Sequence, residues 1–140
     1  MLSRGSNVRY LSQNDILAIH ALLIESTGGS DGVRDIALFR SIVARPRQKA
    51  FGQEAHRGVF NKAAAYLESI ALYHVFVDGN KRTSITVVAR FLSLNGYEFS
   101  VTNAEMECFV LRVVVEKLPT DDIALWLTSH ARKIPKRKKG

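Results

Sequence analysis

Ten consecutive residues, from His74 to Thr83, bring together side chains that suit several kinds of chemistry: they read His-Val-Phe-Val-Asp-Gly-Asn-Lys-Arg-Thr. An imidazole can accept a proton near neutral pH. A carboxylate is an oxygen ligand that suits Mg²⁺. A glycine turn followed by two cations suits an anion such as phosphate. The sequence therefore places its candidate functional site in this segment.

The second half of the segment is predicted to begin a helix. Asn80 is a suitable N-cap for a helix that ends near Asn95. The start of a helix presents unpaired N–H groups and the positive end of the helix dipole, and Gly79 lets a ligand approach the backbone. Lys81 and Arg82 would be unfavourable in this first turn unless an anion binds there. We therefore expect Gly79, Asn80, Lys81 and Arg82 to bind phosphate.

The first half of the segment supplies the candidate base and the candidate metal ligand. His74 is expected at the end of the preceding helix, where it could take the proton of an attacking hydroxyl. Asp78 could hold Mg²⁺ together with substrate phosphates. A purely structural alternative is that Asp78 neutralises Lys81 and Arg82.

Three further residues have structural interpretations. Phe76 is expected to anchor the loop in the core. Thr83 could bond to the helix backbone or contact a ligand, and its sequence position does not separate these roles. His20 lies on the apolar side of the first predicted helix and is interpreted as a core or groove histidine.

The elements that position this site are predicted to be almost entirely helical. Apolar residues recur at helical spacing between capping residues and helix breakers. Residues 97–101 are expected to be extended. The fold class is therefore an all-α single domain of five to seven helices with at most a short β element. The expected helices span about residues 12–28, 35–44, 61–74, 80–95, 103–119 and 120 onward.

Length and charge divide the chain into a domain over residues 10–131, an N-terminal segment 1–9 and a tail 132–140. The 140 residues suit one domain. Six of the twenty basic residues fall in the tail, and the remaining fourteen exceed the thirteen acidic residues by one. The tail is predicted to be basic and disordered. Since little besides this charge favours nucleic-acid binding, direct binding is not expected.

No apolar run is long enough for a membrane span, and the N-terminus lacks the apolar core of a signal peptide. A cytoplasmic protein without membrane contact is therefore expected. Cys108 is the single cysteine. It is interpreted as a small buried hydrophobe.

The segment from His74 to Thr83 resembles the signature of the Fic/Doc family, and in particular of its death-on-curing (Doc) branch. The resemblance extends over about residues 10–127. Matching residues outside the motif are Tyr10-Leu-Ser12, Gly28-Gly29, Gly32-Val-Arg-Asp35, Lys62-Ala-Ala-Ala65, Phe91-Leu-Ser-Leu-Asn-Gly-Tyr97 and Trp126-Leu127.

This resemblance implies a Fic fold that binds ATP and Mg²⁺ at the loop. His74 would be the general base and Asp78 the metal ligand, while Gly79 and Asn80, with Lys81 and Arg82, would hold the phosphates. Most Fic enzymes transfer AMP to a protein hydroxyl. The Doc branch is similar in fold but acts as a kinase on a threonine of elongation factor Tu, which arrests translation.

Two departures from the AMP-transferring pattern favour phosphate transfer. Those members usually carry glycine where this chain has Lys81, and a second arginine where it has Ile85. A lysine in the phosphate cradle adds bulk and charge, so the nucleotide could offer its terminal phosphate instead. AMP transfer remains the alternative, as does a non-catalytic module that binds a nucleotide or a partner.

The family's self-inhibitory pattern, Ser or Thr followed four residues later by Glu and then Gly or Asn, is absent from the sequence. Inhibition is therefore expected from a separate cognate antitoxin. Its terminal segment would dock into a groove of this protein and could fold as it binds.

Overall fold

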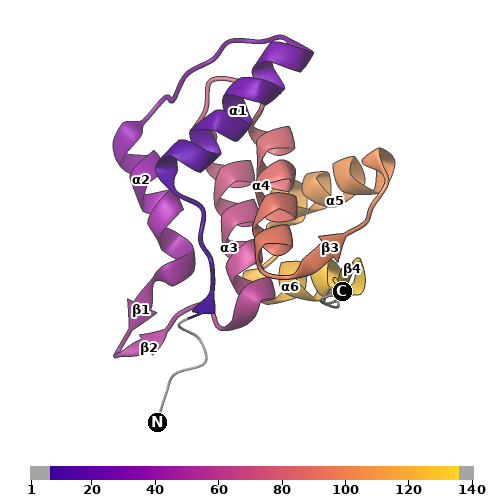
Figure 1. The fold of residues 1–140 in the computed structure, drawn as a ribbon. Helices are drawn as coiled ribbons and strands as arrows, with labels where there is room; N and C mark the ends of the chain where they lie inside the picture. Colours follow the sequence, from indigo (N-terminus) through magenta and orange to yellow (C-terminus); the bar gives the residue numbers. More distant parts are fainter. Residues whose placement is uncertain (1–6, 136–140) are drawn as a thin grey trace, which may run out of the picture.

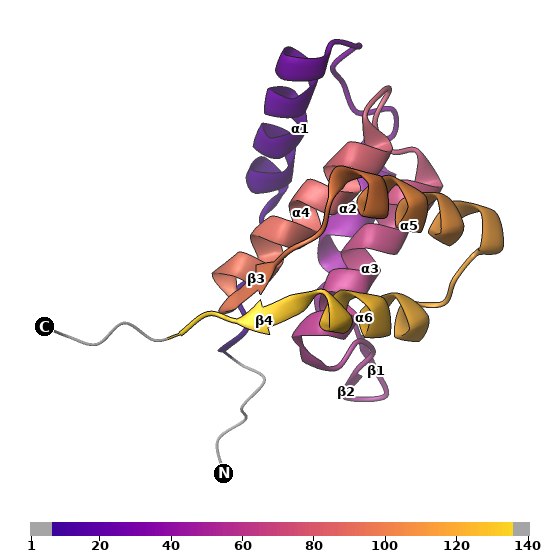
Figure 2. The ribbon, with the colours of Figure 1, turned by 90° about the vertical axis from the view of Figure 1, so that its right-hand side faces the viewer.

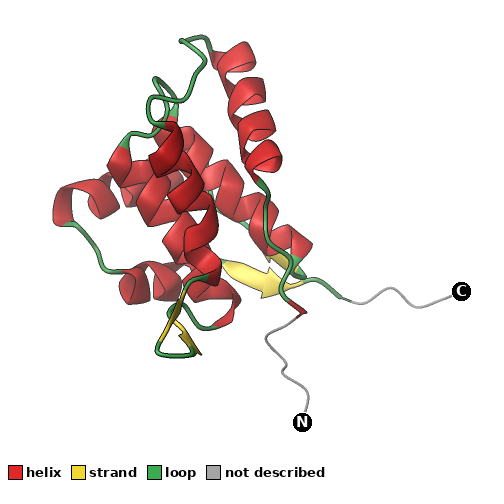
Figure 3. Ribbon diagram, turned by 90° about the vertical axis from the view of Figure 1, so that its left-hand side faces the viewer, coloured by secondary structure: helices red, strands yellow, loops and turns green. Residues whose placement is uncertain are grey.

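The computed structural model describes residues 7–135 and forms a helical domain around two central helices. Figure 1 shows α3 and α4 side by side, with α1 and α2 on one side and α5 and α6 on the other. The helices are α1 (Gln13–Thr27), α2 (Ile36–Ala44), α3 (Gly58–Tyr73), α4 (Asn80–Leu94), α5 (Asn103–Glu116) and α6 (Thr120–Ser129). Six helices with only short strands confirm the predicted fold class, and Figure 3 shows how little strand there is.

The core lies where α3 packs against α4 and α6. The apolar stripe predicted for α3 is buried, and Tyr66 at its centre is fully enclosed. The Tyr66 ring packs edge-on against Phe91 of α4, with ring centroids 5.1 Å apart. Its phenol oxygen accepts the N–H of Leu11 at 3.1 Å. Burial raises the pKa of Tyr66 to about 12, so this hydroxyl stays protonated and ties the segment before α1 to the central helix.

Two helices begin close to their predicted starts at residues 12 and 35. Ser12 caps α1 in a capping box with Asp15, in which each side chain accepts the other's backbone N–H. Asp35 caps α2 and accepts the N–H of Leu38. Gly28 ends α1 as expected. These local side-chain bonds fix the helix starts on either side of the segment that leads to the candidate site.

The predicted caps of α5 and α6 are each one residue too late. Thr102, not Asn103, caps α5, because Glu105 three residues on completes a capping box with it. Pro119, not Thr120, is the N-cap of α6, and Thr120 is its first helical residue. The two aspartates that follow lie in the first turn of α6 as expected.

The segment between α2 and α3, expected to be a loop, contains more structure than predicted. A 3-10 turn, η2 (Arg45–Arg47), leads into a hairpin of β1 (Lys49–Ala50) and β2 (Gln53–Glu54). The exposed Phe51 lies in the hairpin turn. Helix α3 begins at Gly58, one turn before the predicted start at Asn61.

The buried Lys62 of α3 attaches the hairpin to the domain. Its Nζ donates to the carbonyl oxygens of Pro46 and His56 at 3.2 and 2.7 Å, and it forms an ion pair with Glu54 at 3.1 Å. Only 1% of the Lys62 surface is exposed. These contacts from a buried side chain of α3, rather than a periodic or capping pattern, order the segment.

The extended segment predicted after α4 is β3 (Tyr97–Phe99), which pairs antiparallel with β4 (Ala131–Lys133), as Figure 2 shows. Two residues that the charge pattern assigns to the disordered tail, Arg132 and Lys133, therefore belong to a strand. Arg132 also pairs with Glu98 of β3 at 2.7 Å. The rest of the predicted tail from residue 136 lies outside the described residues, as do residues 1–6 of the predicted N-terminal segment.

The predicted burial of Cys108 is wrong, since this residue is exposed on α5. Helix α5 buries Phe109, Val110 and Val113, which leaves Cys108 on its outer side. Among the described helices, none is both long and apolar enough to cross a membrane.

Candidate active site

The predicted site lies in the loop that joins the two central helices, α3 and α4. His74 is the C-cap of α3 and adopts the left-handed conformation, with φ 48° and ψ 48°. A residue in this conformation ends the helix and turns the chain sharply. The turn leaves the imidazole of His74 exposed beside the loop, while the next two residues enter the core.

The loop is anchored by two buried residues and by pairing with the segment that follows α1. Val75 and Phe76 are fully buried, which confirms the predicted anchor. The strand-like segment after α1 runs beside them, and Val33 forms an antiparallel bridge with Phe76. Two backbone hydrogen bonds extend this pairing: the N–H of Arg34 to the carbonyl of Val75 at 2.7 Å, and the N–H of Val77 to that of Gly32 at 3.0 Å. These two bonds hold Val75 and Val77 of the loop to the segment after α1.

Gly79, not Asn80, is the N-cap of α4. It adopts the left-handed conformation, with φ 80° and ψ 18°. A β-carbon there would lie 3.2 Å from the side-chain atom Cδ1 of Ile24, so any other residue would press on this side chain of α1. Asn80 instead is the first helical residue. Its side chain turns back to Phe76, accepting the N–H and donating to the carbonyl, both at 2.9 Å.

This placement corrects how Asn80 can contribute to phosphate binding. Its Oδ1 and one N–H of its amide group are used by Phe76, so the side chain keeps only its second N–H for a ligand. The backbone N–H groups at the start of α4 keep the geometry expected of an anion site at a helix N-terminus.

Asp78 faces the solvent and is fixed from two directions. Its Oδ2 accepts the N–H of Ser30 at 2.8 Å, and its carbonyl oxygen lies 2.7 Å from Nε2 of His20. Within the described residues, Asp78 forms no ion pair with Lys81 or Arg82. The structural alternative, in which Asp78 neutralises these cations, is therefore not supported by a direct ion pair.

One open depression collects the predicted site residues. It has a volume of about 670 Å³ and is walled on one side by the C-terminal end of α1. Six predicted residues line it: His74, Asp78, Gly79, Asn80, Lys81 and Arg82. The structure therefore brings together the candidate base, the candidate metal ligand and the candidate phosphate-binding residues. Their chemical roles stay a prediction.

The other two predicted residues lie beneath the depression rather than in it. Phe76 is a core residue. Thr83 is also fully buried, and its Oγ1 has no hydrogen-bond partner among the described residues. A contact between Thr83 and a ligand is therefore not part of this geometry.

The geometry adds His20, which the sequence pattern interprets as a core or groove histidine. This histidine is 1% exposed, and its ring stacks on Phe76 with centroids 3.9 Å apart. Its Nδ1 lies 3.2 Å from Oδ1 of Asp31. A histidine in a buried apolar stripe needs polar partners, and this is the signal that could have pointed to it. Its partner Asp78, 58 positions away, is not evident from the sequence.

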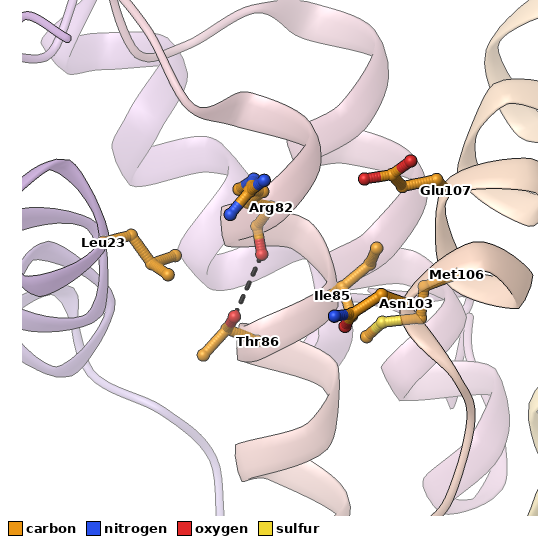
Figure 4. Close-up of a pocket in the computed structure, with 7 residues that line it drawn as sticks. All are labelled: Leu23, Arg82, Ile85, Thr86, Asn103, Met106 and Glu107. Carbon is orange, nitrogen blue, oxygen red and sulfur yellow. Dashed lines mark hydrogen bonds between the residues drawn. The ribbon is translucent and has the colours of Figure 1, made fainter. Parts of the chain in front are cut away.

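A smaller groove of about 230 Å³ adjoins the depression through Arg82. Figure 4 shows it between α1, α4 and α5, with Leu23, Ile85 and Met106 contributing apolar side chains. Glu107 and Asn103 of α5 lie on its far side. The position where a second arginine would extend the phosphate cradle is thus the apolar Ile85, which lines the groove.

The donor groups at the depression fit a phosphate-bound magnesium ion better than a metal held by protein alone. Among residues 7–135, no three His, Cys, Asp or Glu side chains cluster in a metal-binding arrangement. Mg²⁺ is commonly held by one or two carboxylates together with substrate phosphates. One exposed carboxylate, Asp78, beside a helix N-terminus and two cations matches that arrangement.

The fold and the site together define a small helical domain with a histidine, a carboxylate, a helix N-terminus and two cations around one inter-helix loop. The model of the Fic/DOC family matches residues 10–92 of the chain. The protein therefore belongs to the Fic/Doc family.

Two curated relatives place it in the Doc branch. Toxin Doc of Mycolicibacterium smegmatis (strain ATCC 700084 / mc(2)155) is 39% identical over 100 residues, which cover 69% of this chain and 75% of the relative. Protein kinase doc of Escherichia phage P1 is 31% identical over 91 residues, which cover 65% of this chain and 71% of the relative.

Proposed function

We propose that this protein is a Doc-like toxin that transfers the γ-phosphate of ATP to a Ser or Thr hydroxyl of a protein target. One observation carries the proposal: His74, Asp78, the start of α4, Lys81 and Arg82 line a single depression. The names of the two relatives, a toxin and a protein kinase, support the same function.

In the proposed reaction, the target hydroxyl attacks the γ-phosphorus and its proton passes to His74. The bond from the γ-phosphorus to the bridging oxygen breaks, and ADP leaves. The N–H groups at the start of α4, with Lys81 and Arg82, stabilise negative charge on the phosphates. Asp78 would hold Mg²⁺, which when bound neutralises charge on the phosphate oxygens.

Two features favour phosphate transfer over AMP transfer. Lys81 is exposed at the depression, in the first turn of α4, where glycine would leave more room for the nucleotide. Ile85 lies one turn further along and faces the adjacent groove instead of supplying a second arginine. The cradle therefore differs from the AMP-transferring pattern at both positions.

We assign the groove beside Arg82 to the cognate antitoxin. Leu23, Ile85 and Met106 suit an apolar side chain, and Arg82 at the junction suits a carboxylate of the same segment. An antitoxin segment seated there would contact a residue of the phosphate cradle. Occupation of the groove would thereby inhibit transfer without a self-inhibitory segment in this chain.

Elongation factor Tu is the proposed target. The hairpin between α2 and α3 presents the fully exposed Phe51, and Tyr73 beside His74 is half exposed. These aromatic side chains offer apolar contacts to a docking protein. Modification of elongation factor Tu would arrest translation and growth.

The test is a transfer assay with α-labelled and γ-labelled ATP compared side by side, using purified elongation factor Tu and cell extract. The proposal expects label from γ-labelled ATP only and a loss of about 10²-fold or more in His74→Ala. It expects little change in His130→Ala, since this histidine is the C-cap of α6 and does not line the depression. Label from α-labelled ATP would mean AMP transfer. Growth inhibition that survives loss of both His74 and Asp78 would favour a non-catalytic binding module.

Lys81→Gly provides a second, independent arm of the same assay. If Lys81 selects the transferred group, this variant should gain label from α-labelled ATP relative to the wild-type protein. An unchanged preference for γ-label would remove Lys81 from the explanation while leaving phosphate transfer in place.

A further inference from the structure

His20 lies directly beneath the loop, although α1, which carries it, is far from the loop in sequence. Its side chain is almost completely buried, and a buried imidazole requires hydrogen-bond partners. Its Nε2 lies 2.7 Å from the carbonyl oxygen of Asp78. Because a carbonyl oxygen only accepts, the Nε2 atom donates a hydrogen to it. The ring therefore holds the backbone of the candidate metal ligand.

The same ring also contacts the residues on either side of Asp78. It stacks on Phe76 with an interplanar angle of 8°. At Gly79, a β-carbon would lie 3.8 Å from the ring atoms Cδ2 and Nε2, so the chain passes closely over the imidazole. Oδ1 of Asp31 lies 3.2 Å from the opposite ring nitrogen, Nδ1.

His20 does not line the depression itself. A side chain that holds the backbone from below can act on a ligand only through the residues it holds. The groups through which His20 can act on a ligand are the carboxylate of Asp78, on the outer side of the loop, and the N–H groups of Gly79 and Asn80.

From these contacts we infer that His20 is a positioning residue for nucleotide binding: its hydrogen bond to Asp78 sets the carboxylate and the start of α4 at the spacing that a Mg²⁺-bound phosphate requires. The inference rests on the proposed function, because it names how the same site is held in place. A histidine that only filled the core would contribute to stability and not to nucleotide affinity.

Two substitutions separate the hydrogen bond from the packing. In His20→Gln the side-chain amide nitrogen can reach the position of Nε2 and donate to Asp78. In His20→Asn the amide nitrogen reaches only the position of Nδ1, so the Asp78 carbonyl loses its donor. Both variants are polar and both lose the stacking on Phe76, which makes each the control for the other.

The measurement is the affinity for a fluorescent, non-hydrolysable ATP analogue with Mg²⁺, alongside KM and kcat for transfer. We expect His20→Asn to weaken analogue binding and to raise KM for ATP by about tenfold, as for a lost hydrogen bond to an acceptor left unpaired. His20→Gln should stay within about threefold of the wild-type protein. The KM for the protein target should not change in either variant.

Ile16→Val supplies a stability control, since Ile16 is a buried core residue of α1 one turn before His20. It should lower thermal stability without changing analogue affinity. If His20→Gln and His20→Asn bind the analogue equally well, or equally poorly, the positioning role is wrong. A wild-type protein that binds no analogue would instead overturn the proposed function, and this inference with it.

Discussion

The side chain of Asn80 pairs with the backbone of Phe76 in both directions, and this pair closes the loop that carries the candidate site. The Oδ1 atom accepts the N–H and the Nδ2 atom donates to the carbonyl oxygen, each at 2.9 Å. With Phe76 held in the core, the three residues between them turn outward. Asp78 is therefore exposed at the surface while both ends of its loop are fixed.

Asn80→Ala should open this loop and impair transfer. The two hydrogen bonds together contribute about 1–3 kcal/mol to the free energy of unfolding, and their loss frees the backbone that positions Asp78. We expect a stability loss of that size in urea denaturation. We also expect transfer from ATP to fall by more than tenfold, since the site geometry depends on the closed loop.

Asn95 offers a matched control at the other end of α4. Its side chain makes the same two-way pairing with the backbone of Arg9, again with 2.9 Å distances. Its Nδ2 atom also donates to the carbonyl oxygen of Phe91 at 2.8 Å. Asn95→Ala should therefore lose at least as much free energy of unfolding as Asn80→Ala, yet leave transfer by the folded protein unchanged. Equal losses of activity in the two variants would mean that general stability, not the loop, limits transfer.

Gly79→Ala should destabilise the protein more than an alanine at another left-handed glycine. At Gly96, with φ 90° and no atom within 4 Å of a β-carbon, alanine costs about 1–2 kcal/mol for the backbone conformation alone. At Gly79 the β-carbon also meets Cδ1 of Ile24 at 3.2 Å. We expect a further cost of about 1 kcal/mol from this contact.

The steric part of that cost can be isolated by removing the atom that causes it. Ile24→Val deletes Cδ1, so the double variant with Gly79→Ala should be more stable than the sum of the two single effects predicts. Urea denaturation of the four proteins of this cycle measures the coupling. Strict additivity would show that alanine at Gly79 is strained by its backbone conformation only.

The sequence predicts the parts of this structure that depend on local signals. The capping box of Ser12 and Asp15, the buried stripe around Tyr66 and the loop position of His74 are all read from residue types and spacing. The start of α5 could also have been predicted, because Thr102 has a glutamate three residues on. This capping box is a stronger signal than the residue type of Asn103 alone.

Other features could not be predicted from periodicity and capping signals. Asn80 has the residue type of a cap, but its side chain is recruited by Phe76, and the cap position passes to Gly79. The strand at Arg132 forms because β3 provides its partner. His20 meets Asp78 only after α1 packs across the loop. The strand and the His20 contact depend on tertiary structure, and the Asn80–Phe76 pair depends on the shape of the loop; periodicity and capping signals specify neither.

Lys62→Met should detach the hairpin between α2 and α3. The buried ammonium group donates to the carbonyl oxygens of Pro46 and His56 and pairs with the carboxylate of Glu54. Removing it leaves these acceptors without their donor, for which we expect a loss of about 2–3 kcal/mol in the free energy of unfolding.

Lys49→Met is the control for Lys62, because Lys49 is an exposed residue of β1. Its effect should stay within about 0.5 kcal/mol. Protease cleavage near Phe51 should also increase in Lys62→Met and not in Lys49→Met. Equal resistance to cleavage in both variants would show that the hairpin is ordered without the buried lysine.

His56 should make the protein less stable in mild acid. Burial is the largest cause that lowers the pKa of His56 below its ordinary value of 6.5, and the positive charges of Arg45 and Lys62 lower it further. In the unfolded chain the imidazole binds its proton at higher pH than in the folded protein. The stabilisation is therefore complete above pH 6.5 and is lost as the pH falls through the folded pKa.

Urea denaturation between pH 7.5 and 5.5 should show a smaller loss of stability in His56→Gln than in the wild-type protein, because glutamine does not titrate. Parallel pH profiles of the two proteins would mean that other groups cause the acid sensitivity and that His56 is not held in its neutral form by the fold.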